Sequence, residues 1–332
     1  MEDKDPIILE NEFYNKEFRF SYSSINLLLY SPALFYKQYI LKQKEERLDT
    51  HLVDGKVIHA LILEESKFND NFIISPTDLP SDNVRKVINN VFYKVSKTET
   101  PNILSASSLS IYGYEVVEEL LAINLHQSLK TDEQRIAKIV TDENESYWKF
   151  LCIKGTKTVI DQETYLRCST SASLVKNDAT ASELLNGFGK LPMLNEEFIK
   201  VDLKGKPYGL HGQVDNFAMD VTTRTLYIND LKTSGKTLAE FKESVEFYKY
   251  WMQAAMYVKI IKASYSLGHD WHVKFSFIVI DKYQQVYTFK VCSTTLQLWI
   301  DNFEDILKKV DYHYNSKRYD LPYEFLIGDV IL

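Results

Sequence analysis

Three strand-length runs follow one another between residues 198 and 231, and two short polar turns join them. The runs Phe198–Leu203, Tyr208–Ala218 and Thr225–Leu231 are rich in the apolar, β-branched and aromatic residues that favour strands. A parallel pair of strands needs a crossover of a dozen or more residues, so turns this short favour hairpins. We therefore expect the three runs to be neighbours in one sheet.

The segments around these runs complete an α/β pattern. The N-terminal half is mainly helical in its patterning, and Asp54 is typical of a residue that caps a helix through Glu64. The capping-box sequence Thr237–Glu240 starts a second helical stretch. The elements expected after it are a helix over Tyr248–Ser266, strands over Val273–Ile280 and Gln285–Cys292, and a helix over Leu296–Val310. The sequence thus predicts an α/β fold with a mixed central sheet flanked by helices and a helical N-terminal section.

No linker long enough to separate independent domains interrupts the 332 residues. We therefore expect a single domain over residues 1–332, with a helical section at about 20–190 and a catalytic sheet core at about 195–315. The chain is 45% hydrophobic, so it can bury a sizeable core, and this excludes intrinsic disorder.

Composition also limits the compartment and the partners. A net charge of −7 argues against binding nucleic acid through bulk charge, but it leaves room for a local basic groove. The cysteines Cys152, Cys168 and Cys292 have no C-x-x-C spacing, which argues against a four-cysteine zinc or iron–sulfur site and suits a reducing compartment. The longest apolar stretches have strand length, and the acidic N-terminus lacks the apolar region of a secretory signal. We expect a cytoplasmic protein without membrane contact.

Asp230 and Lys232 lie two residues apart at the end of the third run, so their side chains point to the same face. A carboxylate beside a lysine suits metal-dependent phosphodiester hydrolysis, because the acid holds Mg²⁺ while the ammonium orients or deprotonates water and offsets charge on the phosphate. The pattern acid-x-Lys occurs several times in this chain. A single occurrence is more often a solvated ion pair at the end of a strand than a catalytic site. The main rival is Asp202-Leu203-Lys204, which lacks a second acid at the right distance upstream.

Asp215 supplies such a second acid for Asp230. It lies fifteen residues upstream on the preceding run, and a hairpin that turns near residues 222–224 would bring the two carboxylates together. Carboxylate oxygens on neighbouring strands are the hard ligands that Mg²⁺ prefers. The sequence therefore predicts a metal site between these strands.

Two helical motifs accompany these acids. Residues 55–59 read G-x-x-x-H and end at His59, while Gln253 and Tyr257 have the i, i+4 spacing that places both on one helix face. Taken singly, a histidine on an apolar helix is more often packed, and such a Gln/Tyr pair is more often helix surface. The ordered set of G-x-x-x-H, G-x-x-D, D-x-K-T and Q-x-x-x-Y is much rarer than any of its parts.

The aromatic run Phe247–Trp251 leads into the Q-x-x-x-Y motif and allows two interpretations. Its rings could stack on nucleobases. Helical spacing instead favours packing of the rings against the core, and we expect packing.

The ordered set resembles the RecB-like branch of the PD-(D/E)xK nuclease superfamily. The segments Ser21-Tyr22-Ser23, Ser31-Pro32-Ala33 and Gly55–Glu64 are similar to those of the RecE-type exonucleases (exodeoxyribonuclease VIII) and their phage relatives. The similarity extends over residues of about 20 to 315, nearly the whole chain. Val214 stands where the superfamily motif has proline, which does no chemistry there.

The resemblance implies a set of ligands for a divalent metal ion, Mg²⁺ with Mn²⁺ as a substitute. His59, Asp215 and Asp230 would hold or orient the ion, and the backbone carbonyl of Leu231 would be a further ligand. Glu197 matches an acid that many relatives carry before their hairpin.

The resemblance also implies roles for the remaining motif residues. Lys232 would position the attacking water, and Gln253 and Tyr257 would support the site and contact the DNA strand. The expected catalytic set therefore comprises Asp215, Asp230, Lys232, Gln253 and Glu197.

The function that the resemblance implies is Mg²⁺-dependent hydrolysis of DNA. An exonuclease that resects linear double-stranded DNA ends for phage-type recombination is expected, beside a single-strand annealing protein and as a homo-oligomeric ring in the host cytoplasm. Two alternatives stay open. One is a catalytically silent nuclease-like module that binds DNA or protein, and the other is an endonuclease of the restriction type.

Overall fold

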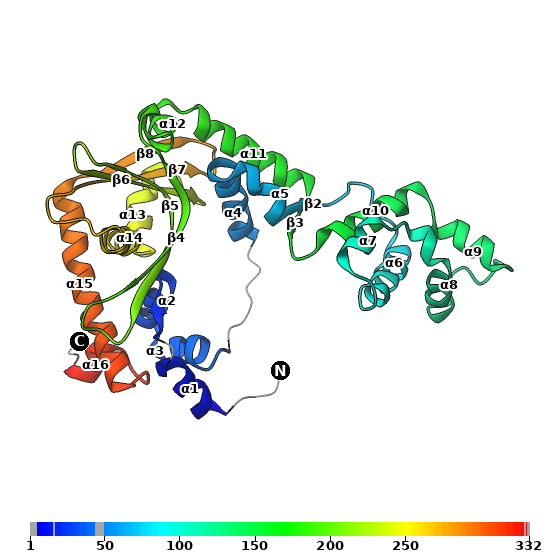
Figure 1. The fold of residues 1–332 in the computed structure, drawn as a ribbon, viewed down its shortest axis with the longest axis horizontal. Coiled ribbons are helices and arrows are strands. Elements are labelled where there is room, and N and C mark those ends of the chain that lie inside the picture. Colours follow the sequence, from blue (N-terminus) through cyan, green and yellow to red (C-terminus); the bar gives the residue numbers. More distant parts are fainter. Residues whose placement is uncertain (1–4, 16, 44–49, 329, 331–332) are drawn as a thin grey trace. The chain divides into compact units, whose positions relative to one another are not determined.

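The chain divides into two compact units in the computed structural model, which describes residues 5–15, 17–43, 50–328 and 330. The core unit comprises residues 1–64 and 171–332, and the inserted unit comprises residues 65–170 (Figure 1). Each unit has its own hydrophobic core. The single domain expected over residues 1–332 stays a prediction. The site residues expected from the sequence all fall in the core unit.

A mixed sheet forms the centre of the core unit, as predicted. Its strands are β1 (Arg19–Phe20), β4 (Leu194–Asp202), β5 (Gly209–Asp220), β6 (Thr225–Ser234), β7 (His272–Asp281) and β8 (Val286–Val291). They follow the order β1-β5-β6-β7-β8, and β4 also pairs with β5. The pairs β4–β5, β5–β6 and β7–β8 are antiparallel, whereas β1–β5 and β6–β7 are parallel. The short turns after β4 and β5 therefore form hairpins, as their lengths indicated.

Helices cover both faces of this sheet (Figure 1). On one face, α14 and α15 pack on a core that includes Phe277, Val279 and Val214. On the other face, α4 and α12 pack on Leu231 and Ile278. The core-unit helices are α1 (Pro6–Asn15), α2 (Tyr22–Tyr30), α3 (Pro32–Phe35), η1 (Tyr36–Ile40), α4 (Thr50–Leu63), α12 (Ala179–Leu185), η4 (Gly187–Gly189), η5 (Leu238–Glu240), α13 (Phe241–Phe247), α14 (Tyr250–Ser264), α15 (Ser293–Ser316) and α16 (Tyr323–Ile327). Cover on both faces explains why β7 is buried without interruption from Phe275 to Asp281.

The helical stretch after the third strand differs from the expectation in one respect. Thr237 and Glu240 form the predicted capping box. The stretch is then interrupted at Lys249, whose left-handed backbone (φ 55°) separates α13 from α14. This break changes the environment of the neighbouring aromatic residues.

The inserted unit is almost entirely helical. Its core surrounds the fully buried Trp148, whose Nε1 donates to Ser107 Oγ at 3.2 Å. The sequence pattern does not predict α10, because the first turn of this helix is polar and its aromatic residues come only after that turn. The elements are η2 (Glu65–Lys67), α5 (Phe68–Asn71), β2 (Phe72–Ile74), α6 (Asp82–Val95), α7 (Pro101–Ala106), η3 (Leu109–Tyr112), α8 (Gly113–Ala122), α9 (Asp132–Ile139), α10 (Asp142–Lys154) and β3 (Thr158–Ile160), and α11 (Gln162–Asn177) continues into the core unit.

Within the part of the chain that the structure describes, we find no helix with the length and apolar character to cross a membrane.

Candidate metal centre

Two buried carboxylates meet where β5 and β6 pair. Asn216 of β5 is paired with Asn229 of β6, and this register brings Asp215 and Asp230 to the same level of the hairpin. Their residues are 6% and 0% exposed. The predicted proximity of the two acids is therefore present, and both are far more buried than acidic residues normally are.

His59 reaches these acids from α4. A Cβ atom at Gly55 would lie 3.2 Å from Thr233 Oγ1, so the glycine of G-x-x-x-H allows the helix to approach β6 closely. His59 Nε2 then donates to the backbone oxygen of Leu231 at 2.9 Å. Its Nδ1 lies 3.9 Å from Asp215 Oδ2. The histidine, the acid and the Leu231 carbonyl that were named from the sequence are thus gathered at one place.

The additional acid at this place is Glu196 and not its neighbour Glu197. Glu196 Oε1 lies 3.2 Å from His59 Nδ1, and Gln213 Nε2 donates to Glu196 Oε2 at 2.6 Å. The backbone of Glu196 is left-handed (φ 49°), which interrupts the side-chain alternation of β4. Glu197 instead pairs with Val214 in the strand register. Glu197 was expected from the family resemblance alone, and that resemblance does not distinguish two adjacent acids.

Burial and neighbouring charges together set the pKa values of Asp215 and His59. Burial raises the pKa of Asp215, although His59 and Lys232 oppose the shift. Burial lowers the pKa of His59, but the nearby carboxylates of Asp215 and Glu196 outweigh it and raise the pKa overall. Both ring nitrogens of His59 face oxygen acceptors, which favours protonation of both nitrogens, so Nδ1 must give up its proton before it can bind a metal ion.

Lys232 and Asp230 form a buried ion pair. Lys232 Nζ lies 2.5 Å from Asp230 Oδ2, and the two side chains are 13% and 1% exposed. Burial raises the pKa of Asp230 to about 6 against the opposing effect of Lys232. Burial lowers the pKa of Lys232, but Asp230 and Asp215 raise it overall, so this lysine is protonated at neutral pH. Asp230 Oδ1 has no hydrogen-bond partner among the described residues.

Gln253 and Tyr257 lie side by side on α14, as their spacing predicts. Gln253 Nε2 donates to Tyr257 Oη at 2.8 Å. Tyr257 is only 4% exposed, and burial together with Asp215 and Asp230 raises its pKa well above 10. A Cβ atom at Gly212 would lie 3.2 Å from the Tyr257 ring, so Gly212 lets α14 pack closely on β5. Tyr257 is therefore placed to support Gln253, and its predicted contact with DNA stays a prediction.

The residues present fit a divalent metal ion. His59, Glu196 and Asp215 each offer a ligand atom, and these atoms lie within 4.8 Å of one another. Imidazole and carboxylate groups are ligands for several divalent ions. A buried carboxylate oxygen without a donor, such as Asp230 Oδ1, is costly for a folded chain unless a cation or another partner satisfies it. The cluster is thus a candidate metal site.

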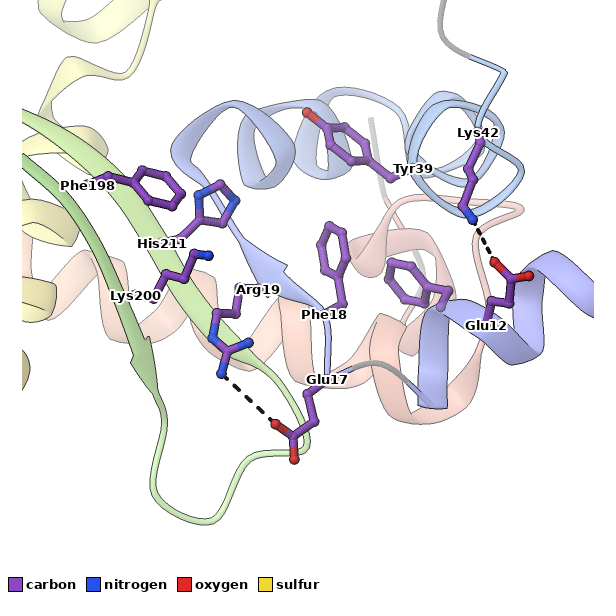
Figure 2. Close-up of a pocket in the computed structure, with 10 residues that line it drawn as sticks. Glu12, Glu17, Phe18, Arg19, Tyr39, Lys42, Phe198, Lys200 and His211 are labelled. Carbon is purple, nitrogen blue, oxygen red and sulfur yellow. Dashed lines mark hydrogen bonds and ion pairs between the residues drawn. The ribbon is translucent and has the colours of Figure 1, made fainter.

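A separate hollow of about 390 Å³ lies farther along the same strands (Figure 2). His211 lines it, four residues before Asp215 and so about 13 Å from it along β5. Burial, together with Lys200 and Arg19, lowers the pKa of His211. Two of its cations are paired, since Arg19 lies 2.5 Å from Asp202 and Lys42 lies 2.7 Å from Glu12. Carboxylates thus balance much of the positive charge at this hollow.

The comparison with known families agrees with this geometry. A family model described as a PDDEXK-like domain of unknown function (DUF3799) matches residues 21–318. The chain belongs to this PDDEXK-like family.

Structural similarity gives the same fold. The crystal structure of a "Putative exonuclease" from Eubacterium rectale is similar to this chain with a TM-score of 0.50 and 11% identity. The match covers 96% of this chain and 90% of the other. No curated protein matches the chain. The PDDEXK-like α/β fold predicted from the sequence is therefore confirmed.

Proposed function

We propose that this protein is a Mg²⁺-dependent deoxyribonuclease that resects linear double-stranded DNA. The observation that carries the proposal is the buried group of Asp215, Asp230 and Lys232 on paired strands, in which Asp230 Oδ1 has no donor. Burying two acids and a lysine is costly, and such arrangements are concentrated at functional sites. A module that only binds its partner would not need these buried charges, which lower the stability of the fold.

The chain's own residues have distinct tasks in this proposal. His59, Glu196 and Asp215 would hold the ion, with Asp230 beside them. When bound, a divalent ion supplies an activated water and stabilises negative charge on the phosphate. Lys232 is protonated, so it acts as a donor that orients the water and offsets the charge developing on the phosphate.

The more specific part of the proposal is attack from DNA ends. It is supported by the resemblance of the serine-rich N-terminal motifs and of Gly55–Glu64 to RecE-type exonucleases. A single-strand annealing partner, a ring-like homo-oligomer and a role in phage recombination remain predictions from the same resemblance.

One assay tests both the metal-dependent cleavage of DNA and the attack from DNA ends. End-labelled linear duplex and closed circular duplex are incubated with the protein in Mg²⁺ or in EDTA, beside the Lys232→Ala variant. We expect Mg²⁺-dependent loss of the linear duplex alone, and almost none with the variant. Cleavage of the circle would indicate an endonuclease. Binding without any cleavage in Mg²⁺ or Mn²⁺ would indicate a silent module.

A further inference from the structure

A row of aromatic rings extends from the buried lysine of the metal centre. Lys232 Nζ lies 4.9 Å from the centroid of the Tyr250 ring. Tyr250 is stacked on Tyr248, with centroids 5.4 Å apart and an interplanar angle of 26°. Tyr248 meets Phe247 edge-on, with centroids 4.9 Å apart. We call Tyr250, Tyr248 and Phe247 the aromatic ladder.

The outer end of the aromatic ladder is open to solvent. Phe247 is 74% exposed and Tyr248 is 44% exposed, whereas Tyr250 and Trp251 pack against the hydrophobic core. The packing expected for the run 247–251 therefore explains its second half only. Exposed aromatic rings leave apolar surface in water, and adjacent rings of this kind often mark a binding surface.

The turn that presents these rings is strained and anchored. Lys249 has a left-handed backbone (φ 55°), which is unfavourable for a residue with a side chain. Two contacts from α2 hold the turn: Lys249 Nζ donates to Asn26 Oδ1 at 3.1 Å, and Tyr22 Oη donates to the backbone oxygen of Tyr248. The backbone that carries the exposed rings is thus held in place before any ligand arrives, which lowers the entropic cost of binding.

We infer that the aromatic ladder stacks an unpaired nucleobase of the strand whose phosphate lies at the metal centre. This inference rests on the proposed nuclease function. Every nucleobase has a π-face, so stacking on aromatic side chains binds single strands with little sequence preference. The ladder starts at the catalytic lysine, which places its open rings within a few nucleotides of the reacting phosphate. A base held there is removed from its duplex, and strand ends supply such bases at the lowest cost.

The test uses the full-length protein and a short single-stranded DNA that carries 2-aminopurine, whose fluorescence reports stacking. EDTA prevents cleavage during the measurement. We expect Phe247→Leu to weaken binding by about 5- to 150-fold, the loss of one stacking contact, and to reduce the fluorescence change. Phe247→Trp should retain both. Phe325→Leu is the matched control, because Phe325 is 56% exposed on α16 outside the ladder, and it should bind as the wild type does.

Two results would overturn the inference. One is wild-type affinity and fluorescence in Phe247→Leu, and the other is a loss of affinity in Phe247→Trp as large as that in Phe247→Leu.

Circular dichroism confirms that each variant is folded. Cleavage of end-labelled duplex by the wild type in Mg²⁺ is measured separately. A wild-type protein that stacks the probe but never cuts DNA contradicts the proposed function and leaves the ladder standing, whereas one that cuts without using Phe247 contradicts the ladder alone.

Discussion

Gly55 of α4 lies so close to β6 that a Cβ atom at this residue would be 3.2 Å from Thr233 Oγ1. The close approach occurs one helical turn before His59, and Thr233 directly follows Lys232. The absence of a side chain at residue 55 therefore sets the distance between the helix that carries the histidine and the strand that carries the lysine and Asp230.

Gly55→Ala should reduce nuclease activity without unfolding the protein. The new methyl group would lie only 3.2 Å from Thr233 Oγ1, so it pushes α4 and His59 slightly away from the acids. A full 1 Å shift can cost about 100-fold in rate, so we expect a smaller loss. Alanine stabilises a helix interior by about 0.5–1 kcal/mol relative to glycine, so the melting temperature should fall little. Adding Thr233→Ala removes the clash and should restore part of the activity. Rates of duplex cleavage over a Mg²⁺ titration decide the matter, and full activity of the single variant would contradict the steric account.

Asp230→Asn should abolish cleavage and leave the protein folded but less stable, because Lys232 loses its partner in a buried ion pair. The substitution keeps the volume of a fully buried side chain but removes the charge that the proposed ion requires. Asp202→Asn is the control, since Asp202 belongs to the rival Asp202-x-Lys204 pair and its side chain is 75% exposed. We expect the control to cut at the wild-type rate in the same gel assay. If the two variants behave in the opposite way, the metal centre is assigned to the wrong strand.

Lys232→Ala should slow cleavage by about 10²–10³-fold, the usual effect of removing one electrostatic group at a transition state. It should also destabilise the protein by up to about 3–5 kcal/mol, because Asp230 loses the partner of a buried ion pair. Urea unfolding and single-turnover kinetics measure the two effects. Lys204→Ala, in the exposed turn after β4, serves as the control. Normal cleavage by Lys232→Ala would remove this lysine from the mechanism.

Cys292 should be the first thiol to react with iodoacetamide. The hydroxyl groups of Thr294 and Thr295, at 3.2 and 3.0 Å, lower the pKa of this exposed thiol to about 7. Thiolate forms as the pH rises through that pKa, so the labelling rate should be half-maximal near pH 7. Burial raises the pKa of Cys152, and Cys168 is buried. Mass spectrometry of peptides labelled at pH 6–9 checks the order, and Cys292→Ser should remove the fast phase. Equal labelling of all three cysteines would show that the threonines do not activate the thiol.

Much of the sheet could be predicted from the sequence because its signals are local. Turn length determined that β5 and β6 form a hairpin, and the register of that hairpin then brought Asp215 beside Asp230. The i, i+4 spacing likewise determined the contact between Gln253 and Tyr257. Such features depend only on the regular geometry of strands and helices.

The remaining features depend on irregular backbone or on long-range contacts. Glu196 faces His59 and the adjacent Glu197 does not, and nothing in the sequence distinguishes these two neighbouring acids. The left-handed Lys249 likewise ends a helix where periodicity continues, and so exposes Phe247. The inserted unit carries no change of composition at its ends, and only its internal contacts reveal it.

The position of the inserted unit in the sequence has a consequence for synthesis of the protein. His59 precedes it and Asp215 follows it, so about 150 residues separate these two members of the metal centre. At ribosomal rates of about 5–20 residues per second, roughly 8–30 s pass between the emergence of the histidine and that of the acid. The inserted unit is one continuous segment with its own hydrophobic core, so it can fold on the ribosome during this interval. The nascent chain therefore cannot assemble the candidate centre until Asp215 and the strand after it have emerged.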